Sequence, residues 1–392
     1  MEKFKIILIL IFTLLVSEIK SQSFDDVLKT IEVNNKEIQA NQKLIESKSY
    51  QYKNMVLPDG PDFSYGFFAD NSSTPGSKET FEISQSFQMP CFYKNQSALS
   101  KLMTEQEKLS FQQIRQSVIS EAKMLLIESV YLTKMSFLLQ ARLVDAENLM
   151  QAFSKRLETG DVNILEVNKS KLYLLQVQNQ LKTVQNDLSA VRKRLVYFNG
   201  GQELNVIIAD YPQSEPFSVE TILAEKQNND PEILYAIKQS ETSSKAVKVT
   251  KNLQLPKFSL GYAGETVADE KFRGFVVGMS VPLWSSNSAI KKAKFESEYT
   301  GLISQLTQSK VESETKLQVE KTQSLKESLD NYSMVLENVN NIDLLKKSLD
   351  LGEISAIEYF LEISYFYETY DNYLLVEKEY QQSIAELLRY KL

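Results

Sequence analysis

The chain has 392 residues, of which 24% are charged and 43% are hydrophobic, an ordinary composition for a folded protein. Its net charge of −7, without a basic stripe, argues against a nucleic-acid binder. There is no histidine and a single cysteine, Cys91, which excludes an internal disulfide and removes the commonest metal ligands and general base. We therefore expect no metal, no cofactor and no enzymatic activity.

Residues 1–23 have the pattern of a secretory signal peptide. Lys3 and Lys5 precede an apolar run at 6–16, which is too short to anchor the chain in a bilayer, and Ser21 and Ser23 are small residues suited to a cleavage site. A buried first helix is the alternative. No cysteine follows the apolar run, so we expect no lipid anchor there.

The remainder of the sequence is duplicated. Gly160-Asp161-Val162 interrupts a long helical pattern, and Gly352-Glu353-Ile354 does the same 192 residues later, with Glu166 and Glu358 at matching positions. A Phe-Ser-x-Gly sequence at 63–66 recurs at 258–261, 195 residues on. The segment 199–216, rich in Gly and Pro, separates the copies. We predict a first structural repeat at 24–210 and a second at 211–392.

Each repeat contains a long helical hairpin. We expect helices at about 96–158 and 289–350 before the two breaks, and helices after them, the second at 355–390. After the first break, apolar residues alternate three and four positions apart, the signature of coiled-coil packing: Leu174, Val177, Leu181, Val184, Leu188, Val191 and Leu195. The glycine of each break lets the chain reverse, so that the second helix packs along the first.

Two short strands precede each long hairpin. Alternation of period two places aromatic and aliphatic side chains on one face and small or polar ones on the other, at 61–70, 79–90, 257–262 and 275–281. Such runs of about ten residues fit transmembrane β-strands, although soluble amphipathic hairpins have the same pattern. Four strands cannot close a membrane barrel, so the strands predict an oligomer, and three copies would supply twelve.

The order and duplication of these features resemble the TolC family of outer-membrane efflux proteins, as does the run from Ser280 to Glu296 after the second pair of strands. The resemblance implies a mainly α fold with a small β part. It implies a homotrimer in which long antiparallel coiled-coil hairpins form a tunnel in the periplasm, and four strands per chain contribute to a twelve-stranded barrel in outer-membrane lipid. It further implies docking, through a periplasmic adaptor (membrane fusion) protein, onto an inner-membrane pump in a Gram-negative bacterium.

The same resemblance assigns candidate site residues. The breaks become the hairpin tips that contact the adaptor, with Gly160, Asp161 and Val162 in one and Gly352, Glu353 and Ile354 in the other. Family members carry acidic residues six and nine positions after the second tip glycine, around the tunnel entrance. Glu358 matches the first position, whereas Leu361 replaces the second with Glu362 beside it. The gate candidates are therefore Glu358, Glu362 and, by repetition, Glu166, although Glu358 could equally be a solvated surface charge.

Two smaller expectations follow from the residues. The tyrosine-rich stretch 359–380 is expected to pack between helices, with ligand stacking as the alternative, and Cys91 is expected to be buried. The predicted function is a passive export duct for substrates delivered by a pump. The alternatives are an exit duct of a one-step protein secretion system and a periplasmic coiled-coil adaptor or scaffold without a pore.

Overall fold

The computed structural model describes residues 23–69, 77–204, 208, 210–212, 217–267, 270–282, 287–338 and 342–392. The predicted signal peptide, apart from Ser23, lies outside this range, as do residues 70–76, 268–269 and 283–286. The chain divides into two compact units. Unit 1 comprises 1–39, 115–222 and 315–392, and unit 2 comprises 40–114 and 223–314. Each unit draws on both predicted repeats.

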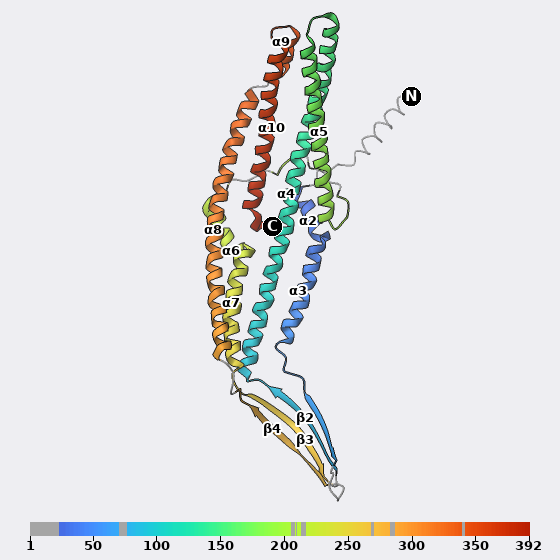
Figure 1. The fold of residues 1–392 in the computed structure, drawn as a ribbon. Coiled ribbons are helices and arrows are strands. Elements are labelled where there is room, and N and C mark those ends of the chain that lie inside the picture. Colours follow the sequence, from blue (N-terminus) through green and yellow to red (C-terminus); the bar gives the residue numbers. More distant parts are fainter. Residues whose placement is uncertain are drawn as a thin grey trace, which may run out of the picture. The chain divides into compact units, whose positions relative to one another are not determined.

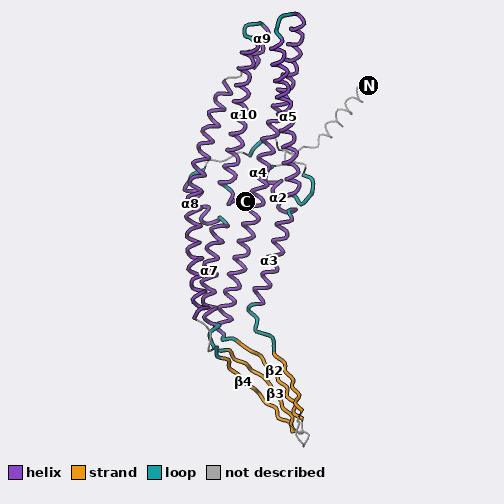
Figure 2. The backbone as a smooth tube through the Cα atoms, viewed as in Figure 1, coloured by secondary structure: helices purple, strands orange, loops and turns teal. Residues whose placement is uncertain are grey.

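Unit 2 contains a four-stranded antiparallel sheet in the order β1 (Asp62–Ala69), β2 (Ser77–Phe87), β3 (Lys257–Val267) and β4 (Glu270–Ser280). All four predicted strands are therefore present (Figures 1 and 2). The pairing of β2 with β3, through partners such as Phe87 and Phe258, joins the two repeats in one sheet. Within the described chain β1 pairs only with β2, and β4 only with β3, so each outer strand has one unpaired edge.

The helices of unit 2 lead into and out of the sheet. They are most of α3 (Lys36–Asn54), the first part of α4 (Pro90–Thr159), most of α6 (Val219–Asn229), α7 (Pro231–Asn252) and the first part of α8 (Asn287–Asn338). Polar contacts join α4 to α3 and to α7. The Tyr52 hydroxyl of α3 donates to Glu107 of α4 at 2.8 Å, and Lys238 of α7 pairs with Glu105 of α4 at 3.1 Å. Burial and Glu107 together raise the pKa of Tyr52 to about 12, so the phenol stays protonated and keeps donating.

Unit 1 contains α2 (Phe24–Asn34), the second part of α4, α5 (Ile164–Phe198), the second part of α8, α9 (Ile342–Asp350), α10 (Ala356–Leu387) and the short helix η1 (Arg389–Lys391). Both breaks are helix reversals, between α4 and α5 and between α9 and α10 (Figure 1). Every member of the predicted coiled-coil seam in α5 is buried or half-buried, and Leu181 packs with Met135 of α4 and Leu374 of α10. The predicted hairpin packing is confirmed.

The helix boundaries differ from expectation in three places. Helix α4 begins at Pro90 rather than near 96, since a proline is well suited to a first helical turn. The predicted helix at 289–350 is divided into α8 and α9, with 339–341 outside the described residues. Cys91 is exposed, so the prediction of a buried cysteine was wrong. As the second residue of α4 it lies in a first turn that the rest of the helix does not cover.

The helix before each pair of strands is divided into two, which the sequence reading missed. Asn35 separates α2 from α3, and Asp230, 195 residues later, separates α6 from α7. Asn35 Oδ1 accepts from the backbone N–H groups of Glu37 and Ile38, and Asp230 Oδ1 accepts from that of Glu232. Ser23 and Ser218, again 195 apart, cap α2 and α6 in the same way. The two predicted repeats therefore have equivalent helix caps as well as equivalent strands.

Candidate functional site

The two hairpin tips have the same backbone turn. Gly160 has φ +78° and Gly352 has φ +73°, in the left-handed region that glycine reaches without strain. The N–H of Gly160 donates to Leu157 and that of Asp161 to Arg156, at 3.1 and 2.8 Å. Gly352 and Glu353 repeat both bonds, to Leu349 and Ser348, at 3.2 and 2.9 Å. This is the Schellman arrangement, which satisfies carbonyls left open at a helix end.

Each tip also starts its second helix with a capping box. The Asn163 side chain accepts from the N–H of Glu166, and the Glu166 carboxylate accepts from the N–H of Asn163 at 3.3 Å. Ser355 and Glu358 form the same pair in the second tip, with the Glu358 carboxylate accepting at 2.8 Å. The sequence reading missed this role, although the spacing of a Ser or Asn three residues before a Glu is its known signal.

The capping bonds set the charge state of Glu358. The backbone N–H and side chain of Ser355 lower the pKa of the exposed Glu358 carboxyl from its ordinary value of 4.5, because both bonds favour the ionised form. Glu362, one turn further along α10, is exposed, and Glu166 is half-buried. The three gate candidates therefore differ: two are caps in equivalent positions, and Glu362 is an exposed carboxylate on the surface of α10.

Beneath the tips lies a shared apolar core. Phe153 of α4 and Val167 of α5 are buried together with Leu349, Tyr359, Phe360 and other residues of the second hairpin, with the rings of Phe153 and Phe360 stacked at 6.2 Å. Val162 and Ile354 pack against this cluster and are half-buried, whereas Asp161, Gly160, Gly352 and Glu353 are exposed. The two hairpins thus form one tip structure, and only part of each predicted contact sequence faces outward.

Exposed aliphatic side chains surround the two turns. Large apolar side chains near the tips that are more than half exposed are Ile164, Leu165, Leu351, Ile357 and Leu361. An apolar surface of this kind, at the end of a helical bundle and rimmed by acidic residues, is typical of a protein contact site. The tips therefore combine a rigid turn, an acidic rim and apolar contact area.

The tyrosines of the stretch 359–380 are buried or half-buried as expected, except Tyr365, which is 60% exposed. Tyr359 and Tyr367 are buried in the tip core, and Tyr370 and Tyr373 pack around Met135 and Leu181. Farther from the tips than this core, polar contacts join α4 to α10. Arg142, almost completely buried, binds Asp371 and lies 4.1 Å from the Tyr367 ring centroid, and Lys134 pairs with Glu377 at 2.9 Å. The sequence did not predict these ion pairs, because their residues lie on helix faces that the heptad pattern does not place in contact.

The sheet of unit 2 has two chemically different faces. Strand register places apolar side chains on one face in rows such as Tyr65–Phe81 and Ile83–Tyr262–Phe275, and many are highly exposed, with Phe275 at 83%. The opposite face carries small and polar residues, including Ser64, Glu82 and Ala263, with Phe68, Phe272 and Val276 as departures. An exposed apolar face opposite a polar one is the pattern of a lipid-facing strand in a membrane barrel.

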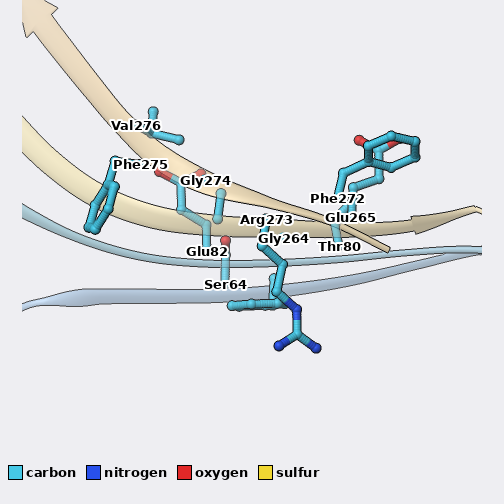
Figure 3. Close-up of a pocket in the computed structure, with 12 residues that line it drawn as sticks. Ser64, Thr80, Glu82, Gly264, Glu265, Phe272, Arg273, Gly274, Phe275 and Val276 are labelled. Atoms are coloured by element: carbon cyan, nitrogen blue, oxygen red, sulfur yellow. The ribbon is translucent and has the colours of Figure 1, made fainter. Parts of the chain in front are cut away.

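Figure 3 shows part of this sheet in detail. Phe272, Glu265 and Thr80, which share a row, extend to one side, and Arg273 extends to the other. The ring of Phe81 lies against Gly264, where an added Cβ would be 2.2 Å from it, so the glycine leaves space for the aromatic side chain. The open hollow of about 440 Å³ along β2–β4 is lined by residues of both faces, and in the described residues no cluster of three or more acidic or cysteine side chains could hold a metal.

No protein-family model matches the chain, and no curated protein matches it either. Solved structures do match. The chain resembles CusC, described as undergoing conformational changes on folding and transmembrane channel formation, with a TM-score of 0.81 and 13% identity over 94% of this chain and 91% of that one. It resembles the CmeC outer-membrane channel of Campylobacter jejuni, with a TM-score of 0.77 and 16% identity over 96% and 90% of the two chains.

A third structure is the open state of the MtrE outer-membrane channel of Neisseria gonorrhoeae, with a TM-score of 0.78 and 11% identity over 94% and 88% of the chains. At these identities the likeness concerns the fold, and it extends over nearly the whole of each chain. The predicted fold, with long helical hairpins and a four-stranded antiparallel sheet, is confirmed. The chain has the fold of the TolC-type outer-membrane channels.

Proposed function

We propose that this protein is an outer-membrane channel of a tripartite efflux system, which conducts substrates passively from an inner-membrane pump to the exterior. The observation that carries the proposal is the sheet: a highly exposed apolar face, a polar opposite face and two outer strands that each have one unpaired edge in the described chain. In water such edges promote aggregation, and in lipid they are not tolerated, so the sheet is stable only when closed with further copies. The channel fold supports the same conclusion.

The proposed assembly is a homotrimer. Three sheets of four strands supply twelve strands, and the open edges of β1 and β4 pair between neighbours. The helices of three chains enclose a tunnel in the periplasm, and the polar sheet face lines the pore. No covalent chemistry and no cofactor take part, since the energy for transport comes from the pump.

The hairpin tips form the periplasmic entrance and the surface for a periplasmic adaptor. Supporting this are their equivalent rigid turns, the exposed aliphatic residues beside them and the exposed acidic side chains Asp161 and Glu353. Glu358 from three copies forms a single acidic ring that favours cations at the entrance. Its capping bonds maintain the negative charge, whereas Glu166, in the same local structure, belongs to the outer hairpin.

The proposal excludes a soluble periplasmic scaffold and is compatible with a duct for secreted proteins, whose fold would be the same. The exposed apolar face of the sheet argues against the scaffold, because large apolar patches are rare on soluble monomers. Extraction of the protein from membranes distinguishes the channel from the scaffold. A channel is released only by detergent and forms trimers with a defined conductance in planar bilayers, whereas a scaffold is released by high salt.

A further inference from the structure

The four joints between helices and strands lie at one end of the sheet. Register pairs Phe87 with Phe258 and Lys257 with Ser280, so the start of β3 lies beside the ends of β2 and β4, and β1 begins at the same end. The chain passes from α3 to β1, from β2 to α4, from α7 to β3 and from β4 to α8 at this end (Figure 2). Residues near these joints therefore gather although they are far apart in sequence.

Lysine is concentrated at this end. The joint segments 50–62, 88–98, 245–257 and 287–298 contain nine lysines against four carboxylates, in a chain whose net charge is −7. Eight of the lysines are exposed: Lys53, Lys94, Lys248, Lys251, Lys257, Lys291, Lys292 and Lys294. Lys257 lies on the polar face of the sheet with Ser259 and Ala263, so we call the other seven the joint lysines. This end of the sheet is therefore locally positive, although the whole protein has a negative net charge.

The joint lysines have few partners in the chain. Lys292 lies 3.5 Å from Glu296, in an exposed pair that contributes little. In the part of the chain that the structure describes, none of the other six forms an ion pair with a carboxylate. The opposite end of the sheet is balanced, with three cations and three carboxylates among the described strand residues: Lys78, Lys271, Arg273, Glu79, Glu265 and Glu270.

Exposed apolar and aromatic side chains lie between the joint lysines. In the same segments the exposed residues include Tyr50, Leu57, Leu253 and Phe295. Lysine interleaved with tyrosine and aliphatic residues, directly beyond a lipid-facing strand region, is the composition of a membrane interface, where apolar groups enter the acyl boundary and ammonium groups remain at the headgroups.

We propose that the joint lysines bind the headgroups of anionic phospholipids in the leaflet on the helix side of the barrel. The phosphate of a headgroup is the acceptor that an unpaired ammonium lacks in this chain, and several lysines near an anionic surface bind it cooperatively through charge. The interaction fixes the depth of the barrel in the membrane and selects phosphatidylglycerol-type lipids over zwitterionic ones. This inference rests on the proposed membrane channel.

Electron paramagnetic resonance of spin-labelled lipids tests the binding. The purified full-length protein, in vesicles of phosphatidylcholine, immobilises spin-labelled phosphatidylglycerol in preference to spin-labelled phosphatidylcholine, and added salt weakens this preference. Replacing Lys291, Lys292 and Lys294 by Gln reduces it at least about fivefold, because a single lysine near an anionic surface contributes a factor of about five. Replacing Lys248 and Lys251 by Gln is a second, independent variant with a smaller reduction.

The matched control replaces Lys171, Lys182 and Lys193 of α5 by Gln, which changes the net charge equally at exposed sites of unit 1 and leaves the preference unchanged. Equal immobilisation of both lipids by the unchanged protein overturns the inference. So does a joint variant that alters the anion-to-cation permeability ratio but not the lipid preference, because the lysines would then line the pore. Full displacement by inorganic phosphate would indicate a free-anion site instead. Failure to insert into vesicles at all would contradict the proposed channel itself.

Discussion

Arg142 of α4 binds both carboxylate oxygens of Asp371 on α10, with Nη2 at 2.5 Å and Nη1 at 2.9 Å. The Arg142 side chain is 4% exposed, and the same nitrogen Nη2 donates to the backbone carbonyl of Tyr367 at 3.3 Å. A guanidinium buried to this extent needs such partners, since an unpaired charge in the interior is costly. This pair joins α10 of the second hairpin to α4 of the first.

Arg142→Ala should destabilise the protein by about 3 kcal/mol, because it removes a buried ion pair and leaves Asp371 without its partner. The expected result is a lower midpoint of thermal unfolding, measured by circular dichroism. Arg194→Ala is the matched control, since Arg194 pairs with Glu121 at 2.9 Å in an exposed position, where such pairs contribute about 1 kcal/mol or less. Equal effects of the two variants would show that burial of Arg142 contributes nothing.

Glu358→Gln separates the proposed gate from the helix cap. Glutamine retains the capping acceptor but has no charge, so the variant should keep the folded tip with slightly lower stability at neutral pH while losing cation preference in planar bilayers. Glu166→Gln makes the same change in the first hairpin and should leave ion selectivity unaltered. If both variants behave alike, Glu358 is a cap and does not line the entrance.

The capping bonds of Glu358 predict a pH dependence. Since its pKa is lower in the folded protein than the ordinary value of 4.5, its stabilising contribution is present above that value and is lost as pH falls through the folded pKa. Unfolding midpoints measured at falling pH should therefore decline less in Glu358→Gln than in the unchanged protein. An identical decline in both proteins would show that this carboxylate has the same pKa folded and unfolded.

Gly352→Val tests the tip turn. No atom would lie within 4 Å of an added Cβ, so the cost arises from φ +73° alone, about 1–2 kcal/mol at that residue. We expect a distorted tip and reduced export, measured as accumulation of substrate in cells, with the trimer still assembled. Gly60→Val is the control, because Gly60 is equally unobstructed and does not have a positive φ. Normal export by the Gly352 variant would show that the turn is dispensable.

Val277→Lys tests the orientation of the sheet. Val277 is 76% exposed on the apolar face, where a lysine in contact with lipid costs about 2–4 kcal/mol near the bilayer centre. The variant should fail to reach the outer membrane in cell fractionation. Ser64→Lys introduces the same side chain on the polar face and should be tolerated. Equal tolerance of both substitutions would indicate that the apolar face does not contact lipid.

The sequence predicted most of the fold because the repeated patterns are local. The heptad seam of α5, the alternating strands and the glycine breaks each depend on neighbouring residues, and the structure places them as expected. The divisions at Asn35 and Asp230 were missed although Asp230-Pro231 is a recognisable helix start, with proline at the first helical position.

The site was less predictable for physical reasons. Glu166 and Glu358 attracted attention as repeated acids, but their repetition is explained by capping, a backbone requirement that applies to any two equivalent turns. The pairing of Arg142 with Asp371 joins residues 229 positions apart. No local pattern indicates such a partner, because only the packing of α10 against α4 brings the two side chains together.

The most direct test of the account is the state of the purified protein. We predict that it is extracted from membranes only by detergent, that light scattering gives the mass of a trimer, and that planar bilayers containing it show discrete conductance steps. A monomer released by high salt without detergent, with no conductance in bilayers, would contradict the central claim that the sheet closes into a membrane pore.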